Sequence, residues 1–163
     1  MMLVKDVMTT RVKTALPNTI LRDVAILMVF HHISGLPVVD ENNTLRGVIS
    51  EKDVLRAMYP KVGDAMKMAQ MPRFEDLENE YHDVLDMPTS AYMTENVFTV
   101  GPEDPILRAV AEMFAHKIRR IPVAIAGKLV GILSIGDVHK AVLRKTFDSE
   151  FAENARHGAA GSS

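Results

Sequence analysis

The sequence of 163 residues contains no cysteine and no apolar run of the roughly 20 residues that a membrane span needs. The absence of cysteine excludes disulfide bonds, thiolate catalysis and Cys-ligated zinc, and it is consistent with a reducing compartment. The first residues, MMLVKDVMTT, lack the apolar core of a signal peptide. We therefore expect a cytoplasmic protein with no membrane insertion.

A strong excess of charge of one sign is also missing. The chain has 19 Lys and Arg against 21 Asp and Glu, a net charge of -2, so its overall balance does not attract nucleic acid or an anionic membrane. We expect neither as a partner, and an anionic ligand would have to be held by local groups. A hydrophobic content of 47% is enough to build the core of one globular domain or of two small ones.

What the sequence does contain is an internal repeat. The stretch VMTTRVKTALP, from Val7, matches YMTENVFTVGP, from Tyr92, and HHISGLPV, from His31, matches HKIRRIPV, from His116. Both matches are offset by 85 positions, as from residue 8 to residue 93. The first copy contributes Met8, Thr9, Val12, Thr14, Pro17, His31, Ile33, Pro37 and Val38, and the second contributes Met93, Thr94, Val97, Thr99, Pro102, His116, Ile118, Pro122 and Val123.

The repeat continues through a shared glycine, serine and aspartate. GVISEKD, from Gly47 to Asp53, matches GILSIGD, from Gly131 to Asp137, at an offset of 84 positions. The lost residue falls between DENNTLRG and IAGKLVG, where two hairpin turns of different length would absorb it. A length change confined to a turn indicates duplication of a folded unit.

Each copy has the same local pattern. After Pro17, Asn18 and Thr19 are N-cap candidates for a helix with apolar residues at spacings i, i+3, i+4 and i+7. A hairpin rich in β-branched residues follows, and then a second helix, at about 51–58 and 135–143. We predict a mixed α/β (α+β) fold of two pseudo-symmetric repeats, each strand-helix-strand-strand-helix, packed as one module. The first helix carries Leu21, Val24, Ala25 and Met28, and its counterpart carries Ile106, Ala109, Val110, Met113 and Phe114.

The segment between the copies has a different character. From Pro72 an acidic helix is predicted, whose apolar stripe must pack on the module or on a second subunit. The tail after Phe147 consists largely of small and polar residues and is predicted to be disordered. The predicted domains are repeat 1 at 4–60, a helical insertion at 61–88, repeat 2 at 89–147 and a disordered tail at 148–163. The stripe consists of Phe74, Leu77, Tyr81, Val84 and Leu85.

These motifs together resemble the tandem CBS domain, also called the Bateman module. A single G-h-h-[ST]-x-x-D pattern is weak, but two copies, each preceded by I-x-x-h-P-V, by a helix and by an M-T start, make the resemblance specific. It covers about residues 4–60 and 89–145. It implies an adenosine-nucleotide sensor with two clefts between the repeats, in a protein that pairs into a homodimer.

The serine and aspartate of each motif have two interpretations. Ser50-x-x-Asp53 and Ser134-x-x-Asp137 fit a capping box, in which the serine caps a helix and the acid reaches back to its amide. A serine hydroxyl at a helix N-terminus is also suited to phosphate, and an aspartate can accept bonds from two ribose hydroxyls. The sequence alone leaves both interpretations open.

The resemblance implies a role for each matching residue. Asp53 and Asp137 would hold ribose, and Ser50 and Ser134 would approach phosphate. Thr14 and Thr99 match positions that line the base. The residues implied to enclose adenine, for which core packing is an equally good explanation, are Ile33, Pro37, Val38, Ile118, Pro122 and Val123.

The two copies differ where the second carries Arg119 and Arg120 and the first carries Ser34 and Gly35. Guanidinium groups can bind phosphate oxygens in a bidentate manner. A solvated basic edge is the alternative, but the place beside a phosphate position favours ligand contact, chiefly for Arg120. We therefore expect the second site to bind phosphorylated adenosine more tightly.

Other candidate sites are weaker. His31 and His32 are adjacent and would point apart on a helix. The methionines of MKMAQM resemble a thioether site, although packing explains them better in a chain with 11 methionines. No Ser/His/Asp set, phosphate-binding loop or pair of catalytic carboxylates is visible in the sequence. We predict no catalytic residue and no metal site.

The sequence thus predicts a regulatory module rather than an enzyme. No cofactor is required, and the regulatory ligand would be AMP, ADP, ATP with Mg²⁺, or an S-adenosyl compound. Ligand binding would change the conformation that an unidentified regulated protein recognises. The alternative is a homodimerisation scaffold without a ligand, in which the motifs are helix caps only.

Overall fold

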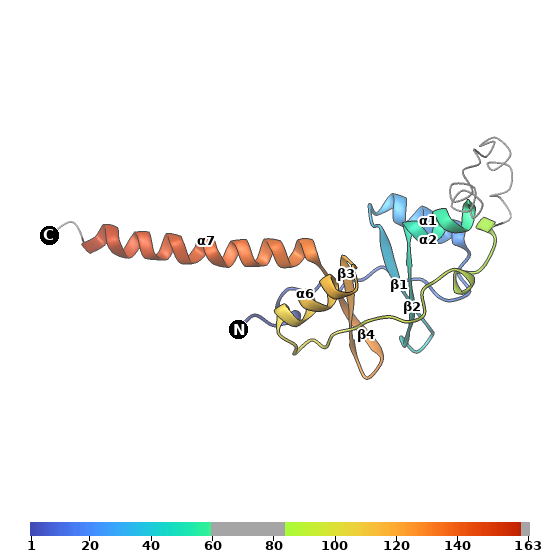
Figure 1. Ribbon diagram of the computed structural model, residues 1–163, viewed down its shortest axis with the longest axis horizontal. Helices are drawn as coiled ribbons and strands as arrows, with labels where there is room; N and C mark the ends of the chain where they lie inside the picture. The colour runs from blue at the N-terminus through green and yellow to red at the C-terminus, as the bar shows by residue number, and fades with distance from the viewer. Residues whose placement is uncertain (60–83, 161–163) are drawn as a thin grey trace. The chain divides into compact units, whose positions relative to one another are not determined.

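The computed structural model describes residues 1–59 and 84–160. Its elements are η1 (Val4–Asp6), α1 (Leu21–Phe30), β1 (Gly35–Val39), β2 (Leu45–Ser50), α2 (Glu51–Met58), η2 (Thr89–Ala91), α6 (Ile106–Ala115), β3 (Arg120–Ile125), β4 (Lys128–Ser134) and α7 (Ile135–Ala160), as Figure 1 shows. The mixed fold class is confirmed. Both predicted hairpins are present as two-stranded sheets, and β1 and β2 are antiparallel.

The two structural units do not coincide with the two sequence repeats. One unit contains residues 1–10, 98–125 and 130–163, and the other contains residues 11–97 and 126–129. We call them the C-terminal unit and the N-terminal unit. Each has its own core, because the helices turn their apolar stripes onto the hairpins. The core of the N-terminal unit includes Leu21, Val24, Met28, Leu36, Val38 and Ile49, and that of the C-terminal unit includes Ile106, Ala109, Met113, Ile121, Val123 and Leu133.

The start of each repeat packs in the unit built mainly from the other repeat. Val4 is fully buried in the core of the C-terminal unit, and its amide donates to the carbonyl of Asp104 at 2.9 Å. Thr89, at the same place in the second repeat, is fully buried in the N-terminal unit, where its hydroxyl donates to the carbonyl of Thr19 at 2.6 Å. We call residues 1–10 and 86–95 the exchanged segments.

The exchanged segments also cap helices. The amide of Leu21, the first residue of α1, donates to the carbonyl of Met87 at 3.0 Å, and the amide of Ile106 in α6 donates to the carbonyl of Met2 at the same distance. Capping by Asn18 or Thr19 was predicted and is wrong. The N-cap is Ile20, which makes no side-chain cap bond, because a backbone carbonyl from the exchanged segment already satisfies the first helical amide.

Each hairpin is extended on both edges by a single bridge. In the N-terminal unit, Ala15 pairs in parallel with β1 at Val38, and Thr94 pairs antiparallel with β2 at Val48. In the C-terminal unit, Val100 and Thr9 occupy the matching places beside β3 and β4. The strand expected at the start of each repeat is therefore reduced to one bridge.

Two features differ from the prediction or extend it. Helix α7 runs to Ala160, so the described part of the predicted disordered tail is helical. Disorder was predicted from the small residues of ENARHGAAGSS. Alanine is, however, the strongest helix former, and no proline interrupts the segment. Of the stripe predicted in the insertion, Phe74, Leu77 and Tyr81 lie outside the described residues, whereas Val84 and Leu85 pack against the core of the N-terminal unit.

Candidate functional site

The junction between β2 and α2 forms a capping box. The Ser50 hydroxyl oxygen accepts from the amide of Asp53 at 3.3 Å, and the Ser50 amide and hydroxyl both donate to Asp53 Oδ2 at 2.9 Å. Asp53 Oδ1 lies 3.8 Å from the guanidinium of Arg56. A carboxylate has about four lone-pair sites, so the cap does not use its full accepting capacity.

The junction between β4 and α7 has the same design. Ser134 Oγ accepts from the amide of Asp137 at 3.0 Å, and the Ser134 amide donates to Asp137 Oδ2 at 3.4 Å. The capping interpretation is thus realised in both repeats. Both serines and both aspartates are half-buried, which leaves part of each side chain accessible.

The loop before each hairpin closes onto the same junction. The carbonyl of Ser34 accepts from the amide of Glu51 at 2.9 Å, and the carbonyl of Arg119 accepts from the amide of Ile135 at 3.0 Å. The strand register sets Gly35 opposite Ser50. The residues that precede β1 and β3 therefore lie next to the capping serines.

The repeats differ in charge at this junction. In the C-terminal unit the loop presents the exposed Arg119 and the half-buried Arg120, whereas the N-terminal unit has Ser34 and Gly35 at those places. The structure thus places the backbone of Arg119 at the N-terminus of α7, where the helix dipole also favours an anion, and Arg120 follows it in the chain.

The predicted adenine-contacting residues divide into two groups. Thr14 and Thr99 are exposed beside the bridging residues Ala15 and Val100, and Ile33 and Ile118 are half-buried at the start of each hairpin. The other predicted contacts are buried and have little accessible surface to offer a base. They are Pro37, Val38, Pro122 and Val123.

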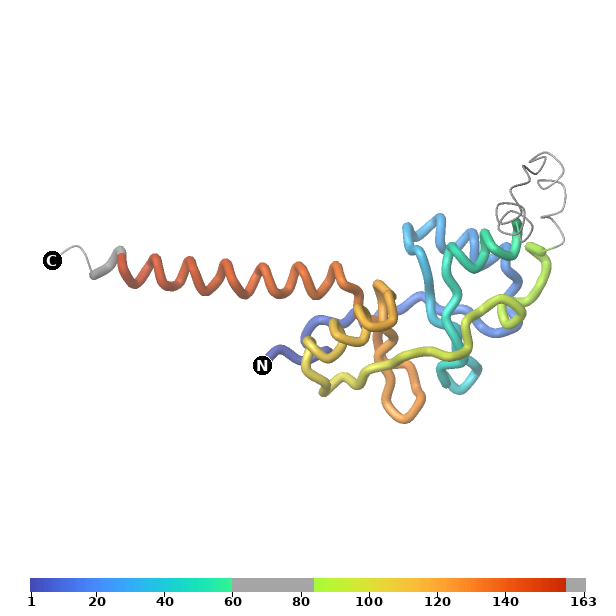
Figure 2. Tube along the Cα trace, viewed as in Figure 1, coloured from blue at the N-terminus to red at the C-terminus, as the bar shows by residue number. Residues whose placement is uncertain are grey.

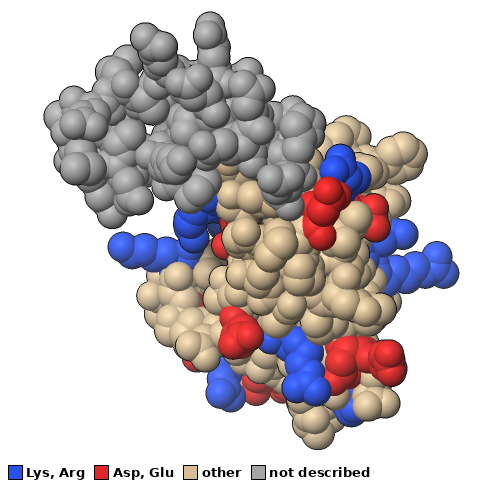
Figure 3. Space-filling model, turned by 90° about the vertical axis from the view of Figure 1, so that its right-hand side faces the viewer, with Lys and Arg blue, Asp and Glu red and all other residues tan. Residues whose placement is uncertain are grey.

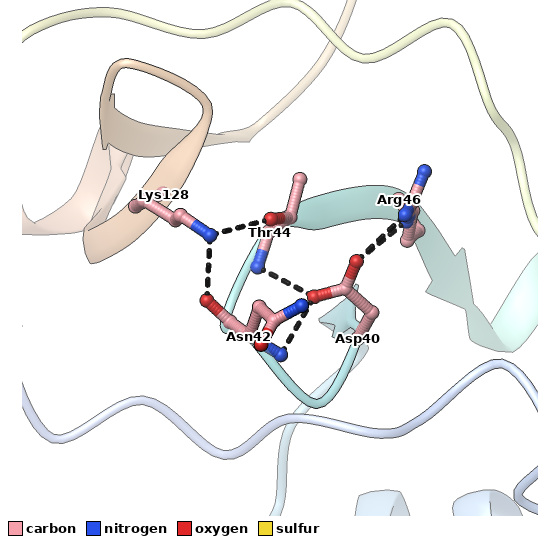
Figure 4. Close-up of polar contacts among 5 residues, drawn as sticks. All are labelled: Asp40, Asn42, Thr44, Arg46 and Lys128. Atoms are coloured by element: carbon pink, nitrogen blue, oxygen red, sulfur yellow. Dashed lines mark hydrogen bonds and ion pairs between the residues drawn. The ribbon is translucent and has the colours of Figure 1, made fainter.

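A polar cluster at the β1–β2 turn was not predicted. Asp40 Oδ1 accepts from the amides of Asn42 and Thr44 at 2.9 Å, and Asp40 Oδ2 lies 2.7 Å from the Arg46 guanidinium (Figure 4). The amide of Thr44 is the main cause that holds the pKa of Asp40 below its usual value, and Arg46 acts in the same direction. Asp in a turn is the sequence signal that could have indicated it.

The same turn binds the tip of the β3–β4 hairpin. Lys128 Nζ donates to the carbonyl of Asn42 at 2.9 Å and to the hydroxyl of Thr44 at 2.8 Å (Figure 4). The amide of Leu45 donates to the carbonyl of Gly127 at 2.9 Å. We assign the cluster to structure, since its polar groups are directed at one another.

Two open cavities lie elsewhere. One, of about 530 Å³, lies between the N-terminal residues and α7 and includes Asp6, Arg144 and Lys145. The other, of about 370 Å³, lies beside the turn at Asp40. None of the predicted ligand contacts lines either cavity.

Metal and membrane features can be stated for residues 1–59 and 84–160. In these ranges no three His, Asp or Glu side chains come together in a way that could hold a metal ion. None of the helices in the same ranges combines the length and apolar character of a membrane span.

Comparison with known proteins gives a consistent result. The family model of the CBS domain matches residues 4–60 and 89–144. The CBS domain-containing protein YhcV of Bacillus subtilis is 29% identical over 135 residues, which are 83% of this chain and 81% of YhcV. These matches confirm the resemblance that the two repeats show.

Solved structures show the same fold. CBSX2 of Arabidopsis thaliana, solved in complex with AMP, is 29% identical, with a TM-score of 0.70 over 88% of this chain and 98% of CBSX2. The AcuB protein of Vibrio cholerae is 26% identical, with a TM-score of 0.73 over 92% of this chain and 96% of AcuB. The likeness extends over most of both chains in each case.

Proposed function

Because this chain belongs to the CBS domain family, we propose that it is an adenosine-nucleotide-binding regulatory module. The observation that carries the proposal is the pair of equivalent strand–helix junctions, each with a half-buried serine and aspartate, in units that each also present an exposed threonine and a half-buried isoleucine. The AMP complex of CBSX2, a relative of the same fold, supports an adenosine ligand.

The proposed contacts follow the chemistry of the two junctions. Asp53 and Asp137 accept hydrogen bonds from ribose hydroxyls through the capacity that the caps leave unused. Ser50 and Ser134 lie at helix N-termini, where phosphate is favoured. Thr14 and Ile33 contact the base in one site, and Thr99 and Ile118 contact it in the other. Val38 and Val123 belong to the two cores.

The second site should prefer a phosphorylated ligand. Arg119 and Arg120 can form charge-assisted bonds with phosphate oxygens, whereas the first site has no arginine in the matching loop. We therefore rank AMP, ADP and ATP above an S-adenosyl ligand for the site at α7. Mg²⁺ would accompany ATP only.

The test is a thermal-shift panel of AMP, ADP, ATP with Mg²⁺, S-adenosylmethionine and GTP. A ligand at about 100 times its dissociation constant should stabilise the fold by about 2.7 kcal/mol. We expect a shift with adenosine ligands and none with GTP. Asp53→Ala and Asp137→Ala should each reduce the shift, and Arg120→Ala should weaken the response to phosphorylated ligands only.

The effect of a substitution on ligand binding must be separated from its effect on helix capping. Loss of a cap lowers the melting temperature of the ligand-free variant by itself, so each variant is compared with its own ligand-free state. Asp23→Ala is the matched control, because Asp23 is an exposed acid in the first turn of α1. The proposal fails if no ligand gives a shift and mass analysis of the purified protein finds no bound nucleotide.

We further propose that the module is a homodimer, which is also the basis of the alternative scaffold function. Apolar side chains are exposed on α1 and on α6, among them Val29 at 76% and its repeat equivalent Phe114 at 69%. Exposed apolar surface on matching helices favours association. In sedimentation equilibrium we expect at least a dimer, and Val29→Asp/Phe114→Asp should lower the mass of the assembly. A wild-type chain that sediments as a monomer would contradict both the dimer and the scaffold.

The proposed activity is binding rather than catalysis. On the face in Figure 3, acidic and basic side chains of the described residues are interspersed, so this view shows no continuous basic patch of the kind that binds nucleic acid. The regulated protein would read the change that the ligand causes. The cytoplasmic location stays a prediction from the sequence.

A further inference from the structure

Residues 142–157 of α7 form a stretch of helix that is not covered by the rest of its unit. The trace of α7 continues far beyond the sheet and α6 of its own unit (Figure 2), and every residue from 142 to 157 is exposed. Helices of this length are marginal in water and depend on tertiary packing of an apolar face. An uncovered helix that nevertheless carries such a face indicates a partner.

The apolar face is a continuous stripe. Leu143, Phe147 and Phe151 follow at intervals of four residues, so they lie along one side of the helix. Their exposures rise from 41% at Leu143 through 52% to 73% at Phe151. The large cavity at α7 is lined instead by Ala141, Lys145 and Ala152 among others, so the stripe and the cavity are on different sides of the helix.

The charges along the helix show which partner fits it. The part before Phe147 is basic, with Lys140, Arg144 and Lys145, and the part after it is mainly acidic, with Asp148, Glu150 and Glu153 against Arg156. A second copy of the helix, placed antiparallel, brings each basic half over an acidic half. A parallel copy would place like charges together, which is unfavourable.

We propose that α7 pairs with α7 of a second copy of this chain as an antiparallel helix pair. The two-fold axis passes near Phe147, where the charge changes sign, and this sets Leu143 of one copy opposite Phe151 of the other. Such a contact is isologous, with the same surface on both copies. It is separate from the faces of α1 and α6 and independent of the nucleotide sites.

The first test is the mass of the full chain in sedimentation equilibrium. Phe147→Asp/Phe151→Asp places charge on the stripe without touching either core. This variant should halve the mass of the assembly or raise the protein concentration at which the chains associate. The matched control is Ser149→Asp/Ala152→Asp, which places the same charge on the cavity-lining side of the same helix and should leave the mass unchanged. An unchanged mass in the α7 variant, or a wild-type chain that is monomeric, overturns the proposal.

The second test reports orientation and uses the absence of cysteine. With the axis at Phe147, position 140 of one copy faces position 154 of the other, whereas two residues at position 140 are about 20 Å apart. A mixture of Lys140→Cys and Asn154→Cys chains should form a disulfide on mild oxidation, and neither variant alone should do so. The antiparallel pair is overturned if either variant cross-links with itself. It is also overturned if the mixture forms no disulfide, which is the result expected if another protein covers the stripe.

Discussion

Replacement of Gly131 by alanine should lower the free energy of unfolding by about 1–3 kcal/mol, and Gly47→Ala should have a similar effect. A methyl group at Gly131 would lie 2.7 Å from the sulfur of Met8 and 2.9 Å from the carbonyl oxygen of Thr9. The methionine side chain can move, but this carbonyl accepts the Ile132 amide at 2.9 Å and is fixed by the bridge. The exchanged segment must therefore shift to admit the methyl group.

Urea denaturation of the ligand-free protein measures the effect. Gly101→Ala is the matched control, because its added methyl group would come no closer than 3.5 Å, to a carboxylate oxygen of Asp104. Equal stability of Gly131→Ala and Gly101→Ala would contradict the prediction, because it would show that the exchanged segment can move away from β4 without loss of stability. Near equality of Gly47→Ala and Gly131→Ala would support equivalent packing in the two units.

Val4→Asp should destabilise the C-terminal unit by at least about 3 kcal/mol. The side chain of Val4 is fully buried among apolar residues, and an unpaired carboxylate there loses its hydration without gaining a partner. The destabilisation cannot exceed the free energy needed to undock residues 1–10, because the carboxylate regains its hydration once the segment leaves the core. If the segment undocks, α6 loses the carbonyl of Met2 that caps its first amide.

Hydrogen exchange of the backbone amides shows whether residues 1–10 undock or remain in place in the Val4→Asp variant. Undocking should expose the amides of α6 and β4 first, while those of α1 and β1 remain protected longer. Thr10→Asp provides the control, since it adds the same charge to an exposed position of the same segment. Equal protection in the Val4 and Thr10 variants would contradict a structural role for Val4.

Much of the fold could be predicted from the sequence because the repeat shows the same pattern twice. The hairpins, the helices after them and the change of length in the turn follow from β-branched runs, helical spacing and the offset. The exchange of segments could not be predicted. The two copies are equivalent, so Met8 and Thr9 would pack as well beside Gly47 as beside Gly131, and either arrangement fits the same pattern.

The local geometry of the polar candidate residues could be predicted from the sequence, whereas the burial of the apolar candidates could not. Ser50, Asp53, Ser134 and Asp137 lie where the motif places them, because a capping box fixes all its members by local geometry. The motif does not indicate how deeply each apolar residue is buried. Val38 and Val123 are apolar and in register, but only the packed structure shows that both are fully buried.

The exchange of segments has a consequence for the origin of the fold. A chain with only one repeat would leave its first ten residues without a core to enter and the first amide of its helix without an acceptor. Two such chains could satisfy each other by trading these residues in a domain-swapped dimer. Gene duplication and fusion would then have joined the two partners into one polypeptide, and separation of the halves should yield fragments that fold only when mixed.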